Sequence, residues 1–150
     1  ITSSSDEKLA LARSLGADIT INYRTHPDWE AEVMAATGGA GADIIVETGG
    51  QAGLARSIGA AACNGRIVLI AVGPLPDAPL PNFGGIIGKN LTIKGIAEGS
   101  RAMMVRLLRA MDVHGIQPVI DRTFSFDEVP AAYAYLASAS HVGKVMVRVS

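Results

Sequence analysis

The chain has 150 residues, of which 49% are hydrophobic and 5% aromatic, and its formal net charge is −1 at pH 7. This length is sufficient for one domain with a hydrophobic core, and the balanced charge gives no indication of a nucleic-acid surface. The single cysteine, Cys63, excludes an internal disulfide and a multi-cysteine metal cluster, and we expect it in the core. No apolar run approaches the length of a membrane span and no signal peptide opens the chain. We therefore expect a cytoplasmic protein without nucleic-acid or membrane partners.

Strands and helices alternate along the first part of the sequence. Ser4, Ser5 or Asp6 can cap the first helix, because their side-chain oxygens accept hydrogen bonds from the unpaired amides of its first turn. Gly16 ends that helix, and Pro27 begins the second. The elements predicted up to residue 62 are a strand end at 1–3, a helix ending at 15, a strand at 18–23, a helix at 27–36, a strand at 43–48 and a helix at 54–62.

The same alternation continues to the end of the chain, after a proline-rich loop at 74–81. The elements predicted there are a strand at 66–72, one helical turn at 84–88, a strand at 91–95, a helix at 101–114, a strand at 119–124, a helix capped by Asp127 and ending at 136, and a strand at 142–149. Helical stretches between apolar strands imply crossover connections and a parallel sheet, so the fold class is α/β.

The strand at 43–48 ends in an acid and two glycines, in the run DIIVETGG. Ligands bind at the carboxyl ends of strands in open α/β sheets, so Glu47, Thr48, Gly49 and Gly50 are candidates for the rim of a binding crevice. The alternative is a strand that only needs a tight exit into the next helix. We expect Glu47 to be a structural acid bonded to backbone rather than a catalytic group.

Several runs of the sequence resemble one family when taken together and in order. They are ITSSSDEKLALARSLGAD, INYR, PDW, TGGAGADIIVETGG, GRIVLIAVG, LTIKGIAEGSRAMM and HVGKVMV. In this order and spacing they resemble the C-terminal, nucleotide-binding part of the medium-chain dehydrogenase/reductase superfamily, in its zinc-type alcohol dehydrogenase and quinone oxidoreductase-like branch. The resemblance implies a Rossmann-like doubly wound parallel sheet.

Two features of that family have no counterpart here, and we expect residues 1–150 to be an incomplete NAD(P)-binding domain. The first strand with its Gly-rich loop is expected to lie before Ile1, and the catalytic domain, with any zinc ion, is expected to be absent from this chain. No catalytic or metal-ligating residue is therefore assigned, and His26, His114 and His141 are expected to be solvated. With strand order 3-2-1-4-5-6, the missing strand should lie between the first strand and the strand at 43–48, so we expect residues 1–36 to be displaced, poorly ordered or paired with another molecule.

The residues at the end of the first strand bear on the choice of cofactor. NAD-binding relatives carry an acid there that accepts hydrogen bonds from the adenosine ribose, whereas this chain has Ser3. Ser3, Ser4 and Ser5 supply hydroxyls at a helix N-terminus, and Lys8 adds positive charge, a combination that suits the 2′-phosphate of NADP(H). The alternative is that the serines only cap a helix.

The resemblance also implies the remaining cofactor contacts. These are Thr48, Gly49 and Gly50 near the adenosine side, Val72, Gly73 and Pro74 near the nicotinamide carboxamide, Ile96 and Glu98 facing the same amide, and Lys144 near the pyrophosphate. Lys144 would offset a phosphate charge. The alternative, to which the sequence gives equal weight, is an ordinary surface lysine without a role in binding.

Two functions remain open from the sequence. The first is the nucleotide-binding part of an NADPH-dependent oxidoreductase, which transfers hydride between the nicotinamide and a carbonyl, alcohol or quinone bound by the absent domain. The second is a non-catalytic nucleotide-binding or oligomerisation module. Relatives dimerise through the segment that corresponds to 75–94, so we expect a homodimer in which Leu80, Phe83 and Ile86 contact the partner.

Overall fold

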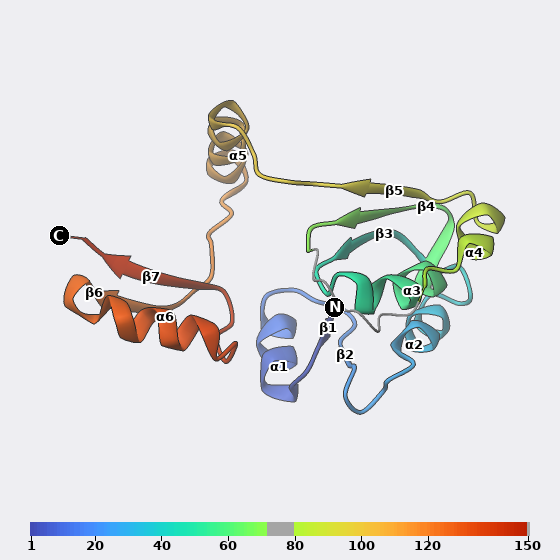
Figure 1. The fold of residues 1–150 in the computed structure, drawn as a ribbon, viewed down its shortest axis with the longest axis horizontal. Coiled ribbons are helices and arrows are strands. Elements are labelled where there is room, and N and C mark those ends of the chain that lie inside the picture. Colours follow the sequence, from blue (N-terminus) through green and yellow to red (C-terminus); the bar gives the residue numbers. More distant parts are fainter. Residues whose placement is uncertain (72–79, 150) are drawn as a thin grey trace. The chain divides into compact units, whose positions relative to one another are not determined.

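A computed structural model describes residues 1–71 and 80–149, which form two compact units, Ile1–Glu98 and Gly99–Ser150 (Figure 1). The predicted cofactor contacts Val72, Gly73 and Pro74 fall outside the described residues. Within the described ranges, no helix is long and apolar enough to cross a membrane.

The first unit alternates strands and helices along the chain, as the sequence predicts. Its elements are β1 (Thr2–Ser3), α1 (Asp6–Ser14), β2 (Ile21–Asn22), α2 (Trp29–Ala36), β3 (Ala42–Glu47), α3 (Gln51–Ala60), β4 (Ala61–Leu69), α4 (Phe83–Gly88) and β5 (Thr92–Gly95). Every strand pairing in it is parallel. The α/β class and the parallel pairing are therefore confirmed.

The strands of the first unit form two sheets rather than one. β1 pairs with β2, and β3, β4 and β5 form a second sheet in the order β3-β4-β5. The first two strands thus lie in a different sheet from β3, but residues 29–36 are not displaced, because α2 packs against α3. Each sheet ends at an edge, and β3 offers one of these edges.

The core of the first unit lies between the three-stranded sheet and α3. Ile58 of α3 and Ile67 of β4 are almost inaccessible to solvent, at 1% and 0% exposure, and Ile45 and Ile93 pack against them. The opposite face of β3 is open, with Ile44 and Val46 65% and 58% exposed. Since side chains alternate across a strand, α3 covers one face of the sheet only.

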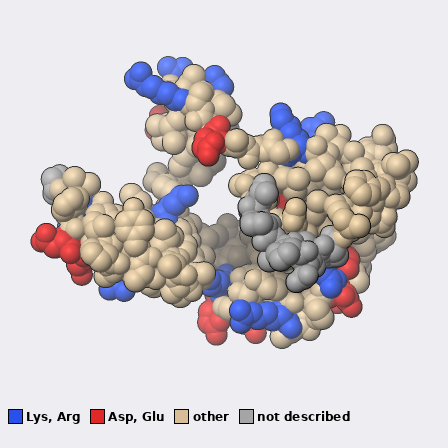
Figure 2. All heavy atoms as spheres, viewed as in Figure 1, with Lys and Arg blue, Asp and Glu red and all other residues tan. Residues whose placement is uncertain are grey.

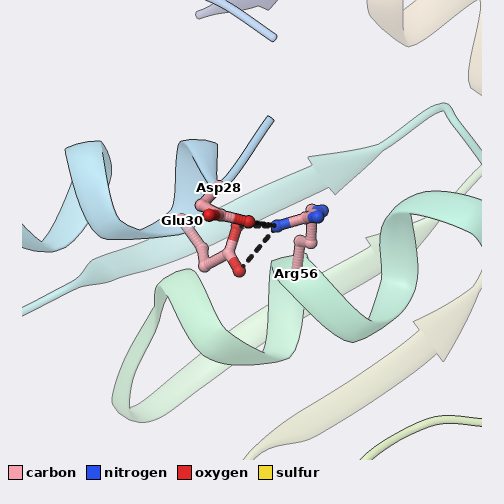
Figure 3. A network of polar contacts seen from close by, with 3 residues as sticks. All are labelled: Asp28, Glu30 and Arg56. Carbon is pink, nitrogen blue, oxygen red and sulfur yellow. Dashed lines mark hydrogen bonds and ion pairs between the residues drawn. The ribbon is translucent and has the colours of Figure 1, made fainter. Parts of the chain in front are cut away.

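An ion-pair network joins α2 and α3 (Figure 3). One guanidinium nitrogen of Arg56 lies 2.9 Å from Asp28 Oδ1 and 2.8 Å from Glu30 Oε2. The hydrogen bonds to Glu30 and then to Asp28 raise the pKa of Arg56. Because Asp28 and Glu30 lie at the start of α2, the network fixes that helix against the middle of α3.

The second unit contains two helices and a parallel strand pair. Its elements are α5 (Arg101–His114), β6 (Ile120–Ser125), the single 3-10 turn η1 (Phe126–Glu128), α6 (Val129–Ala137) and β7 (Lys144–Arg148). α6 covers the strand pair and buries Phe124 and Ala132. By contrast, Met104, Leu107 and Leu108 of α5 are each more than half exposed. Figure 2 shows acidic and basic side chains interspersed over the visible face.

Three local predictions are wrong. Ser125, not Asp127, caps the last helical segment, in a capping box where Ser125 N donates to Glu128 Oε2 at 2.9 Å. The helix predicted to reach residue 62 ends at Ala60, and β4 already begins at Ala61, where it pairs with Ala42. Cys63 is exposed rather than in the core, because the next residue, Asn64, has φ +60° and interrupts the regular strand.

Candidate functional site

Glu47, the last residue of β3, is buried and holds the turn that follows. Its side chain is 5% exposed and accepts hydrogen bonds from the amide of Gly49, at 2.6 Å, and from the hydroxyl group of Ser57 on α3. The expectation that Glu47 is a structural acid bonded to backbone is therefore confirmed.

The turn itself presents its backbone to solvent. Thr48 and Gly49 are exposed, whereas Gly50 is buried, with φ +69°, and precedes the first turn of α3. A side chain at Gly50 would be strained at this φ. The exposed residues lie at the carboxyl end of β3 and beside a helix N-terminus, where parallel α/β sheets bind anionic ligands.

The carboxyl ends of β3, β4 and β5 lie next to one another. Ile70 N donates to Glu47 O at 3.0 Å, and Ile96 N donates to Leu69 O at 2.9 Å, so each strand exit is tied to the one before it. Ile96 is 47% exposed, and Glu98 is exposed two residues later. The structure therefore brings the predicted contacts at 48–50 and 96–98 to the carboxyl ends of the strands in the three-stranded sheet.

The serines after β1 are partly buried at the start of α1. Ser5 is the N-cap: its oxygen accepts from the amide of Lys8 at 3.3 Å, and its hydroxyl donates to Glu7 Oε2 at 2.6 Å. The hydrogen bond from Ser5 lowers the pKa of Glu7, which keeps a negative charge beside the serines. Ser5 therefore caps the helix, as the alternative interpretation of the serines expects. The carboxylate of Glu7, which the sequence did not indicate as part of this site, lies beside it.

A surface groove of about 490 Å³ lies next to these serines. It runs between α1, β2 and α2, and its polar lining carries both charges, with Asp6, Arg13, His26 and Glu32 among its residues. Asp6 also accepts a hydrogen bond from the side chain of Asn22 at 2.8 Å, which ties α1 to the end of β2. The groove was not predicted, because its walls come from three elements that only folding brings together.

Lys144 begins β7 in the second unit, where its side chain is exposed. His26 and His114 are exposed as expected, but His141 is half-buried and its Nδ1 atom, within the described chain, has no hydrogen-bond partner. Among the described residues no three His, Cys, Asp or Glu side chains are grouped to hold a metal ion. The side chains of the described residues therefore do not fit a zinc site.

Comparison with known proteins places these observations in one family. The profile of the family described as zinc-binding dehydrogenase matches residues 1–112. A zinc-type alcohol dehydrogenase-like protein of Schizosaccharomyces pombe is 38% identical to 99% of this chain, which covers 44% of that protein. A zinc-type alcohol dehydrogenase-like protein of Leptosphaeria maculans is 30% identical over 99% of this chain and 43% of its own length.

Solved structures agree with the sequence matches. A structure from Sinorhizobium meliloti 1021 superposes on 99% of the chain with a TM-score of 0.88 and 42% identity, and the match covers 42% of that structure. An NAD-dependent alcohol dehydrogenase matches 99% of the chain with a TM-score of 0.86 and 32% identity, over 43% of its length. The chain thus spans about two fifths of the relatives it matches. It belongs to the zinc-binding dehydrogenase family, whose members here are alcohol dehydrogenases and related oxidoreductases.

Proposed function

We propose that this chain is the nucleotide-binding part of an NADP(H)-dependent oxidoreductase that acts on a carbonyl, alcohol or quinone. The observation that carries the proposal is the Thr48–Gly50 turn after β3, in which Thr48 and Gly49 are exposed and buried Glu47 accepts a hydrogen bond from Gly49. Family membership supports a nicotinamide cofactor. When bound, the nicotinamide ring donates or accepts a hydride, and the protein supplies position and electrostatics.

The proposed roles follow from what each group offers. Thr48, Gly49 and Gly50 would bring backbone close to the adenosine half, and the backbone at Ile96–Glu98 would face the carboxamide. Lys144 would offset one charge of the pyrophosphate. The substrate would bind outside residues 1–150, in a separate catalytic domain. None of these residues is assigned a proton-transfer step.

The preference for NADP(H) rests on the end of β1. Since the hydroxyl group of Ser5 is occupied by the helix cap and by Glu7, the proposed hydroxyl contacts of the phosphate are Ser3 and Ser4. Lys8 is proposed to add positive charge. A hydroxyl at Ser3 can donate to a 2′-phosphate, whereas a carboxylate there would repel it. The Glu7 carboxylate beside Ser5 opposes binding of a phosphate here, and one structural relative is NAD-dependent.

Calorimetric titration of the intact protein with NADPH and NADH tests both parts of the proposal. We expect tighter binding of NADPH, and we expect Ser3→Asp to weaken NADPH by roughly ten-fold without weakening NADH, because the new carboxylate can accept hydrogen bonds from the ribose of NADH. Ser14→Asp adds the same charge at the other end of α1 and serves as the matched control. A ten-fold preference for NADH would refute the NADP(H) assignment, and negligible binding of both would favour a non-catalytic module.

We also propose that another strand completes the sheet of the first unit. An additional strand between β1 and β3 would give the order 3-2-1-4-5-6 and join the two sheets of the first unit. The open edge of β3 supports this, since an unpaired edge of backbone donors and acceptors is completed by another strand. Hydrogen exchange checks it: the edge amides of β3 should be protected in the intact protein and unprotected in residues 1–150 alone.

We further propose a homodimer through residues 75–94. Within the described part of this segment, Leu80, Phe83 and Ile87 are 85%, 65% and 80% exposed, which supports a partner surface. Ile86, which the sequence assigns to that surface, instead packs on the core around Ile58. Sedimentation of the intact protein should give a dimer that Ile87→Glu dissociates and that Val113→Glu, at a 77% exposed position outside the segment, leaves unchanged; a monomer would contradict the proposal.

A further inference from the structure

The turn that leads into β7 is held tightly against the residue before β6. Gly143 has φ +103°, and a Cβ atom added to it would lie 2.5 Å from the carbonyl oxygen of Val119. The amide of the next residue, Lys144, donates to the same oxygen at 2.8 Å. Only glycine fits this position, and its close approach fixes where the backbone of Lys144 begins.

A β-bulge lies directly opposite this turn. Ile120 pairs with Lys144 and Arg122 pairs with Val145, so Asp121 is the extra residue on β6. Bulges of this kind change the direction of a side chain next to functional sites. Here the Asp121 carboxylate accepts from the amide of Val142 through Oδ1, at 3.0 Å, and from the Tyr135 hydroxyl through Oδ2, at 2.7 Å. We call Asp121, Tyr135 and Val142 the Asp121 clasp.

The aromatic end of the clasp is itself fixed by packing. The ring of Tyr135 lies 5.9 Å from that of buried Phe124 and 6.2 Å from that of His141, measured between centroids. The guanidinium carbon of Arg122 lies 4.6 Å from the Phe124 centroid and 5.6 Å from the Tyr135 centroid. The amide of Val142 and then the Tyr135 hydroxyl lower the pKa of Asp121, so the carboxylate is ionised and accepts both hydrogen bonds at neutral pH.

We propose that Asp121 and Tyr135 are positioning residues, which anchor the 141–144 turn so that Lys144 presents its ammonium group to the cofactor pyrophosphate. The inference rests on the proposed role of Lys144. Lysine loses much side-chain freedom when it binds an anion, so a fixed backbone at its base reduces the ordering cost of binding. The Asp121 clasp holds the turn at Val142, and the carbonyl oxygen of Val119 holds it at Lys144.

The test compares ligands with and without a pyrophosphate, in the intact protein. Tyr135→Phe keeps the ring packing but removes the hydroxyl, and should weaken NADP⁺ about five-fold while leaving adenosine 2′-monophosphate unchanged. Lys144→Met should weaken NADP⁺ by about ten-fold, and the double variant should be no weaker than Lys144→Met alone. Asp121→Ala should behave like Tyr135→Phe, and Asp121→Asn should recover part of the loss, because its amide oxygen can still accept from Val142.

Tyr133→Phe, on the same helix but 69% exposed, is the matched control and should bind like the unmodified protein. Equal loss of both ligands in Tyr135→Phe would show a general folding role and overturn the inference, as would additive losses in the double variant. If Lys144→Met weakens NADP⁺ binding but Tyr135→Phe does not, the inference about the clasp is refuted while the proposed role of Lys144 stands. If neither NADP⁺ nor NAD⁺ binds the unmodified protein, the proposed function fails and the inference fails with it.

Discussion

The carboxylate of Glu47, at the end of β3, accepts a hydrogen bond from the hydroxyl group of Ser57 on α3, and both residues are buried. The same carboxylate accepts from the amide of Gly49 in the exposed turn. One acid therefore connects the helix that covers the sheet to the turn proposed to meet the cofactor.

Replacing Glu47 with Gln should destabilise the protein. A carboxylate accepts from both donors, whereas the amide of Gln has one acceptor oxygen and places an N–H group against the second donor. An unsatisfied buried group costs about 1–3 kcal/mol, which urea unfolding of the intact protein measures. Asp43→Asn makes the same kind of change at an exposed position of β3 and should have little effect. Equal stability of E47Q and the unmodified protein would show that the carboxylate is not required.

Gly53→Ala should destabilise the protein although alanine normally favours helices. A Cβ atom at Gly53 would lie 2.7 Å and 2.8 Å from the two carboxylate oxygens of Glu47, which is held in place by its own hydrogen bonds. We expect a loss of about 1–3 kcal/mol from overpacking. At Gly88, at the end of α4, an added Cβ meets no atom within 4 Å, so Gly88→Ala should be neutral or stabilising by up to about 1 kcal/mol.

The same close contact predicts that substitutions at Glu47 and Gly53 have non-additive effects on stability. In a Glu47→Ala background the clash is removed, so Gly53→Ala should lose most of its cost there. Urea unfolding of the two single variants and the double variant measures this coupling. Additive costs would mean that Gly53→Ala acts through helix geometry rather than through Glu47.

Lys89 should contribute to stability through the end of α3. Its ammonium group donates to the carbonyl oxygens of Ile58, Gly59 and Ala61, at 3.1, 2.7 and 2.8 Å. A cation at a helix C-terminus is favourable, and here it also satisfies carbonyls that lack helical partners. Lys89→Met keeps the aliphatic stem and should cost about 1–3 kcal/mol in urea unfolding. Lys94→Met, on the exposed side of β5, is the control; equal costs would contradict the assignment.

The Asp121 clasp should make stability depend on pH in both directions. The amide of Val142 and the Tyr135 hydroxyl lower the pKa of Asp121, so its contribution is full above the unfolded pKa, near 4, and is lost as pH falls through the native pKa. The hydrogen bond to Asp121 raises the pKa of Tyr135, so that contribution is full below about pH 10 and is lost as pH rises further. Arg122 and His141 also face the clasp and favour the ionised carboxylate.

Urea unfolding from acid to alkaline pH checks these signs. Asp121→Asn should flatten the acid limb of the stability curve, and Tyr135→Phe should flatten the alkaline limb. Tyr133→Phe should reproduce the curve of the unmodified protein. An acid limb that Asp121→Asn leaves unchanged would assign the acid dependence to other carboxylates, such as Glu128, whose pKa the amide of Ser125 lowers.

The sequence by itself determined the α/β class and the order of the elements, because periodicity, capping and turn residues act over a few neighbouring positions. Its motifs, taken in order, indicated the family. It also indicated that Glu47 would be structural. It did not determine the Ser57 partner of that acid or the joining of Asp121 to Tyr135 and Val142. Those depend on which elements pack together over long sequence separations, and only the tertiary structure decides that.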